Sequence, residues 1–223
     1  VAAPAPSTVG EAAARAAGWL AAASALGKHD SRDAPHVIVT PERSFDQSRV
    51  VAGIERALSQ YGFAVATIQE NVRDTHGRPL IGDGAPLHVD DFGNEYHEGA
   101  GRYLTTLVAN HLGVRVRYDR PGTIQRSMAE LVSSVDAREA EEAGRSAVRY
   151  ALDGETNQMV SIVRVADDPY ASETGLTALE PVAGAHKSMP SEFLDSEGLP
   201  TGAFLDYALP LIGAPLPTFG RIA

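Results

Sequence analysis

Short apolar runs alternate with segments of helical periodicity along the first half of the chain, and this alternation constrains the fold more than any other feature. Apolar runs at 36–40, 63–68 and 114–118 are typical of buried strands. Apolar residues at helical spacing predict helices over about 50–62 and 103–113, each ending at a glycine. Strands that alternate with helices favour an α/β protein, so we predict three layers around a largely parallel sheet.

The N-terminal segment predicts a helix instead of a strand. Residues 1–7 are rich in proline and alanine and are expected to be irregular. Thr8 and Glu11 match a capping box, which predicts an alanine-rich helix ending near Gly27. The apolar run at 19–26 is too short to span a bilayer and is interpreted as part of that amphipathic or buried helix.

A polar, glycine-rich stretch over 71–97 is interpreted as loops that can include a hairpin. Some of its imidazole and carboxylate side chains could be drawn as a metal site, because both groups are common ligands. Their spacing matches no ligand template, so we favour solvated loop residues. The side chains concerned are His88, Asp90, Asp91, Glu95 and His97.

The C-terminal third is predicted to contain one long helix, one strand and one short helix. Asp136 and Glu139 are interpreted as the capping residues of the long helix, which ends at Gly154. A strand is expected over 159–165 and a helix near 201–209.

Charge and composition limit the partners. The formal net charge of −10 argues against nucleic acid, because binding a phosphate backbone normally needs a basic face. The chain has no cysteine, which removes disulfides and thiolate nucleophiles and fits a cytoplasmic location. We therefore expect neither nucleic acid nor a membrane as partner, while a small anion remains possible where arginines gather.

Arginines gather in one such place, residues 117–126. Arg117, Arg120 and Arg126 surround a Pro-Gly turn that directly follows a predicted strand. The planar donor fork of a guanidinium matches the oxygens of a phosphate, so the segment is typical of a phosphosugar site. A solvated arginine loop is the alternative on spacing alone.

Five segments in order resemble the phosphofructokinase family, most closely the C-terminal half of a bacterial pyrophosphate-dependent enzyme. The first is the Glu-Ala-Ala-Ala-Arg-Ala-Ala-Gly-Trp-Leu segment at 11–20, and the second is the Pro-Glu that follows the predicted strand at 36–40. The third is the strand that ends in Gln-Glu at 69–70, and the fourth is the Gly-Thr-Ile-Gln-Arg turn at 122–126. The last is the tail, with its segments at 173–176 and 207–213. The resemblance implies a phosphofructokinase-like substrate domain over 1–135, with 136–223 packing on a donor domain that precedes it.

The resemblance also implies roles for five residues. Arg117, reaching across from a neighbouring subunit, and Thr123 would hold the 6-phosphate of fructose 6-phosphate. Glu70 and Arg126 would hold the sugar hydroxyls, with a mutual ion pair in an empty site as the alternative. Arg15 occupies the arginine position of the family's Met-Gly-Arg segment.

The chain departs from the family pattern beside Arg15. Ala13 and Ala14 replace the Met-Gly pair of that segment. Alanine restricts a backbone that glycine leaves free. An ordinary surface position on the predicted helix is therefore the alternative for Arg15. Thr123 also offers only a hydroxyl where relatives often have histidine or tyrosine.

The catalytic aspartate and the donor loops of the family have no counterpart here. No Thr-Ile-Asp and no Gly-Gly-Asp-Gly occur in the sequence. The expected activity is phosphoryl transfer from pyrophosphate (or ATP) to fructose 6-phosphate, a glycolytic reaction, with Mg²⁺. It would belong to an intact cytoplasmic enzyme, either a homo-oligomer or an assembly with an N-terminal-half chain, and we expect this chain alone to be inactive. The alternatives are a non-catalytic sugar-phosphate-binding or regulatory paralogue and a structural subunit of an active partner.

Overall fold

We describe a computed structural model of the chain, which divides into two compact units. The structure describes residues 6–12, 17–81, 86, 88–93, 95–96, 99–122 and 124–216, and only the backbone of 95, 96, 125 and 126. The first unit comprises 1–126 and 187–201, and the second comprises 127–186 and 202–223.

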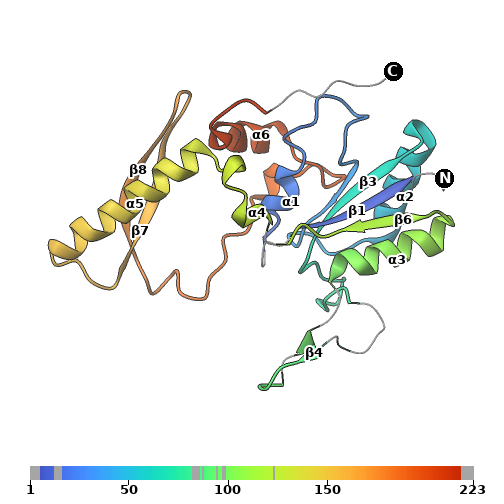
Figure 1. Cartoon of the computed structure of the whole chain (residues 1–223), viewed down its shortest axis with the longest axis horizontal. Helices are drawn as coiled ribbons and strands as arrows, with labels where there is room; N and C mark the ends of the chain where they lie inside the picture. The colour runs from blue at the N-terminus through green and yellow to red at the C-terminus, as the bar shows by residue number, and fades with distance from the viewer. Residues whose placement is uncertain are drawn as a thin grey trace. The chain divides into compact units, whose positions relative to one another are not determined.

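A four-stranded parallel sheet forms the centre of the first unit (Figure 1). Its strands, in spatial order, are β2 (Val37–Val39), β3 (Ala64–Gln69), β1 (Ser7–Ala12) and β6 (Val116–Asp119). All three neighbouring pairs are parallel. The prediction of an α/β protein with a largely parallel sheet is confirmed.

Helices cover both faces of this sheet. α2 (Gln47–Tyr61) and α3 (Ala100–Leu112) pack on one face, where Val9, Ile54 and Leu104 belong to one buried apolar cluster. The short α1 (Trp19–Ala23) packs on the other face, where Ala21 belongs to a second buried cluster with Ile38. Helices on both faces give the three layers that the alternating pattern predicts.

Glycines end α2 and α3 where the sequence predicts. Gly62 follows α2 with φ 78°, and Gly113 follows α3 with φ 63°. Both lie in the left-handed region that glycine enters without steric cost, and each donates its N–H to the carbonyl four residues back. Between β3 and α3, the two-residue strands β4 (His88–Val89) and β5 (Glu95–Tyr96) form the hairpin within the loop region.

The predicted N-terminal helix is wrong, because Ser7–Ala12 is the strand β1 in the interior of the sheet. Ser7, Val9 and Glu11 are all buried, which is the two-residue period of a strand. Glu11 does not cap a helix that starts at Thr8. Its carboxylate accepts a hydrogen bond from the backbone N–H of Gly101 instead.

The second unit is a long helix lying on a two-stranded hairpin (Figure 1). α5 (Ser134–Leu152) packs on β7 (Gln158–Asp167) and β8 (Tyr170–Ala178). Tyr170 and Ser172 of β8 donate hydrogen bonds to the buried carboxylate of Glu139. Glu139 thus joins the helix to the hairpin and does not cap it.

The capping residue of α5 is Ser133, whose hydroxyl accepts from the N–H groups of Val135 and Asp136.

The strand β8 is absent from the prediction. The predicted C-terminal helix is confirmed as α6 (Gly202–Ala208), and the remaining short elements are α4 (Ile124–Ser127) and the 3₁₀ turns η1 (Ala129–Leu131), η2 (Ser191–Phe193) and η3 (Leu209–Ile212). None of the helices in the described part of the chain is long and apolar enough to cross a membrane.

Candidate functional site

The carboxyl ends of three parallel strands bring charged residues together at one edge of the sheet. In the register of the sheet, Glu11 of β1 lies opposite Ile68 of β3, and Gly10 lies opposite Asp119 of β6. Glu70 and Arg120, which directly follow β3 and β6, therefore lie beside the end of β1. Ligands of open α/β sheets bind at this edge, so it is the candidate site.

Glu11 is the buried anchor of this edge. Its side chain has no exposed surface, and Oε2 lies 2.7 Å from the N–H of Gly101 in the first turn of α3. A carboxylate at the N-terminus of a helix is favoured by the exposed N–H groups and the helix dipole. The approach depends on glycine, because a Cβ at Gly101 would lie 2.8 Å from Oε2 of Glu11 and 2.6 Å from Cε2 of Tyr118.

Arg120 joins the buried carboxylate to a more exposed one. Its Nε lies 2.9 Å from Oε1 of Glu11, and its Nη2 lies 3.8 Å from Oε2 of Glu70. The side chain of Arg120 is 51% exposed and that of Glu70 is 24% exposed. The guanidinium therefore bridges two carboxylates and keeps a surface that a ligand can reach.

Tyr118 completes the surroundings of Glu11. Burial, together with the charge of Glu11 and a hydrogen bond to it, raises the pKa of the Tyr118 phenol from 10.0 to about 12. The folded protein thus favours the protonated phenol, which can donate to the carboxylate.

A pH dependence follows from this shift. The stabilisation by Tyr118 is fully present below pH 10, the unfolded pKa, and is lost as pH rises through the folded pKa of about 12. We expect Tyr118→Phe to lower the free energy of unfolding by about 1–2 kcal/mol at pH 8, allowing for partial exposure. The difference between the two proteins should shrink from pH 10 upward in urea titrations, and a constant difference from pH 8 to 11 would contradict the assignment.

The structure describes the side chains of some of the predicted site residues and not of others. Glu70 lies at the candidate site. Arg117 is exposed on the edge strand β6, and because side chains alternate along a strand it points to the face opposite Tyr118. Arg15, Thr123 and the side chain of Arg126 lie outside the described residues, so the expected pairing of Glu70 with Arg126 stays a prediction.

Sequence reasoning missed two residues of the site, Glu11 and Arg120. The period-two pattern of Ser7, Val9 and Glu11 could have identified the strand. The sequence places Arg120 in an arginine turn that is typical of a phosphosugar site, but it does not predict the contacts of Arg120 with Glu11 and Glu70.

Glu42, from the Pro-Glu pair after β2, has a structural position. Its Oε1 accepts hydrogen bonds from the N–H groups of Gly18, 2.9 Å away, and Met189, 3.1 Å away. The carboxylate thereby joins the start of α1 to the returning segment 187–201.

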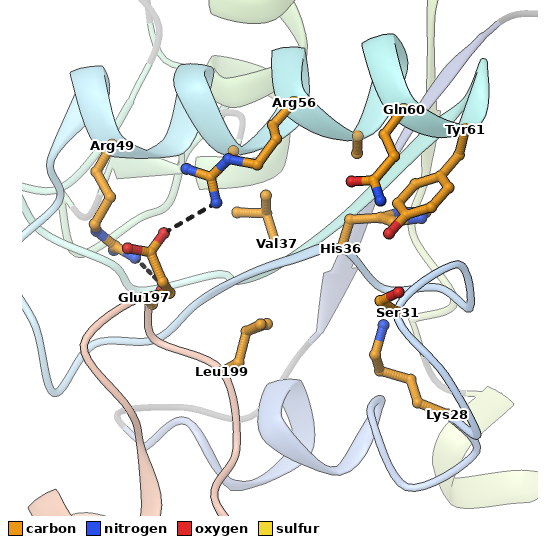
Figure 2. Close-up of a pocket in the computed structure, with 12 residues that line it drawn as sticks. Lys28, Ser31, His36, Val37, Arg49, Arg56, Gln60, Tyr61, Glu197 and Leu199 are labelled. Atoms are coloured by element: carbon orange, nitrogen blue, oxygen red, sulfur yellow. Dashed lines mark hydrogen bonds and ion pairs between the residues drawn. The ribbon is translucent and has the colours of Figure 1, made fainter.

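A cavity of about 180 Å³ lies elsewhere in the first unit, between α2, the loop before β2 and residues 197–199 (Figure 2). Its charged groups are engaged with the protein itself. Arg56 lies 3.6 Å from the carboxylate of Glu197, and Arg49 donates to the Glu197 carbonyl. Lys28 donates to the carbonyl of Pro35 over 2.7 Å. The two arginine contacts fasten segment 187–201 to α2, and the cavity contains none of the predicted site residues.

No group of three or more histidine, aspartate or glutamate side chains gathers at a metal-binding spacing in the described part of the chain.

Comparisons with known proteins identify relatives of this chain. No family model matches the sequence. Over 214 residues the chain is 39% identical to the pyrophosphate–fructose 6-phosphate 1-phosphotransferase of Rhodospirillum rubrum, covering 93% of this chain and 52% of that protein. The protein of the same name from Xanthomonas campestris pv. campestris is 35% identical over 208 residues, covering 93% of this chain and 49% of that protein.

Solved structures agree on the fold. The crystal structure of a pyrophosphate-dependent phosphofructokinase from Nitrosospira multiformis matches with a TM-score of 0.79 at 28% identity, covering 98% of this chain and 51% of that chain. The chain thus spans about half the length of the curated relatives it matches. Over nearly its whole length, the chain resembles the pyrophosphate-dependent branch of the phosphofructokinase family.

Proposed function

We propose that this chain is the fructose 6-phosphate-binding half of a pyrophosphate-dependent 6-phosphofructokinase. The observation that carries the proposal is the carboxylate of Glu70 at the carboxyl edge of β3, 3.8 Å from a guanidinium of the arginine turn. A carboxylate accepts hydrogen bonds from sugar hydroxyls. The arginine turn beside it, residues 117–126, supplies further guanidinium groups of the kind that bind phosphate.

The proposed roles follow the resemblance. Glu70 accepts from hydroxyls of the sugar, and Arg126 donates to them. Arg117 and Thr123 hold the 6-phosphate, and the exposure of Arg117 on an edge strand supports its reaching a neighbouring subunit. Arg15 is proposed to line the same pocket.

The chemistry divides between this half and the rest of the enzyme. The 1-hydroxyl oxygen forms a bond to the transferred phosphorus, the bond from that phosphorus to the bridging oxygen of pyrophosphate breaks, and phosphate leaves. The hydroxyl proton passes to a general base, proposed to be an aspartate of the other half. The residues here position the acceptor, and positioning is a large part of catalysis in phosphoryl transfer. Mg²⁺ and the donor are proposed to bind outside the described residues, and we derive no step through them.

A binding measurement with Arg126→Ala tests the proposal. We expect the variant to bind fructose 6-phosphate about 1–3 kcal/mol more weakly in calorimetry, because a hydrogen bond from a charged group is lost. Arg138→Ala, on the exposed face of α5 in the second unit, is the matched control and should leave the affinity unchanged.

Two outcomes would contradict the proposal or change it. Equal affinity of Arg126→Ala and the unaltered protein would remove the role of Arg126. Tight binding without any phosphoryl transfer by the full natural polypeptide would favour a regulatory sugar-phosphate-binding protein.

A further inference from the structure

The contacts at the sheet edge form a chain of three side chains with different exposure. Glu11 is fully buried, Glu70 is partly buried, and Arg120, which lies between the two carboxylates, is half-exposed. Glu11 is fixed by the N–H of Gly101 and by the close approach of Gly99, where a Cβ would lie 2.4 Å from Oε2 of Glu11. The innermost member of the chain therefore has one position.

A fixed Glu11 also restricts Arg120. The Nε of Arg120 lies 2.9 Å from Oε1 of the buried carboxylate, and its Nη2 lies 3.8 Å from Oε2 of Glu70. A guanidinium held at one end loses less side-chain entropy when its other end engages a partner. The charge of Arg120 can thus attract the Glu70 carboxylate to its side of the site before any ligand arrives.

We propose that Arg120 is a positioning residue for Glu70, and that Glu11 is the buried anchor that makes it one. The inference rests on the proposed function, because it assigns to Arg120 the orientation of the group that accepts the sugar hydroxyls. Arg120 acts on the sugar end of the ligand through Glu70, and the phosphate end is held by other residues.

A comparison of two ligands distinguishes the positioning of Glu70 by Arg120 from a general disruption of the sheet edge. Inorganic phosphate probes phosphate binding without any sugar, here and at the donor site of the other half, whereas binding of fructose 6-phosphate also needs the residues that hold the sugar. A substitution that frees only the Glu70 side chain weakens the binding of fructose 6-phosphate and leaves the binding of inorganic phosphate unchanged. A substitution that disrupts the whole sheet edge weakens the binding of both ligands.

The variants must avoid an unpaired buried charge. Arg120→Gln alone would leave Glu11 ionised and buried without its cation, which is strongly destabilising. The double variant Glu11→Gln with Arg120→Gln replaces the pair by neutral amides. Arg120→Lys keeps the charge beside Glu11 but lacks the planar fork that spans two carboxylates. Thermal unfolding of each variant shows that the fold is retained.

In calorimetry on the full natural polypeptide, we expect the double variant to bind fructose 6-phosphate about tenfold more weakly or worse, with the affinity for inorganic phosphate changed by less than about twofold. Arg120→Lys should fall between the double variant and the unaltered protein for fructose 6-phosphate. If the double variant does not fold, Arg120→Lys carries the same test.

Three results would overturn the inference. An unchanged affinity of these variants for fructose 6-phosphate, while Arg126→Ala still weakens it, would show that Arg120 does not position Glu70. The proposed function would then be unaffected. An equal loss for both ligands would make Arg120 a phosphate ligand or a purely structural residue. No binding of fructose 6-phosphate by the unaltered protein would overturn the proposed function and the inference together.

Discussion

Gly101→Ala is expected to lower the free energy of unfolding of the first unit by about 1–3 kcal/mol, the range for forcing extra volume into a packed site. The added Cβ would lie 2.6 Å from Cε2 of Tyr118 and 2.9 Å from Cβ of Glu11. The Cβ of Glu11 is attached to the central strand β1 and can move only with its backbone. The measurement is urea unfolding followed by circular dichroism.

Two controls separate this steric effect from helix propensity. Thr106→Ala adds an alanine at an exposed position of the same helix, α3, and should be neutral or slightly stabilising. Gly144 lies in α5, where an added Cβ would have no neighbour within 4 Å, so Gly144→Ala should stabilise the second unit by about 0.5–1 kcal/mol. Gly101→Ala behaving like Gly144→Ala would show that α3 and Glu11 are not in the close contact described here.

The parts of the fold that were predictable are those whose signal is local. α2 and α3 each have an apolar face and end at a glycine with positive φ, so a short window of sequence contains both the period and the end. The strand β2 is entirely apolar and β3 is mostly so, because both faces of the sheet are covered. Such features need no knowledge of distant residues.

The wrong and missing predictions concern elements whose conformation depends on residues far away in the sequence. In β1, a glutamate three residues after a threonine matches a helix cap as well as a strand. The burial of Glu11 becomes favourable only when Gly101 and Arg120, about one hundred residues later, bring an N–H and a cation. β8 is rich in serine, threonine and glutamate, and its strand form comes from pairing with β7 and from Glu139.

Of the candidate site, too, only a part was predictable from the sequence. Resemblance identified Glu70, and the structure places it at the carboxyl edge of the sheet as expected. Arg120 belongs to no family motif that we noted. Only the fold shows that the strand before it ends beside β1, where Glu11 can hold its guanidinium.

Glu70→Gln is expected to weaken the binding of fructose 6-phosphate by about 1–3 kcal/mol, which corresponds to roughly a 5- to 150-fold loss of affinity. The amide keeps the size of the carboxylate and one acceptor oxygen, but it loses the charge that strengthens hydrogen bonds from sugar hydroxyls. It also loses the attraction to Nη2 of Arg120, 3.8 Å away. Calorimetry with fructose 6-phosphate measures the change.

Glu197→Gln is the matched control, since it makes the same chemical change in the same unit. Glu197 pairs with Arg56 beside the cavity of Figure 2, and neither residue belongs to the sheet edge. Its carboxylate is half-exposed, so the loss of this ion pair should cost little stability. If Glu197→Gln weakens binding and Glu70→Gln does not, the sugar phosphate binds beside α2. The carboxyl edge of the sheet would then have to be abandoned as its site.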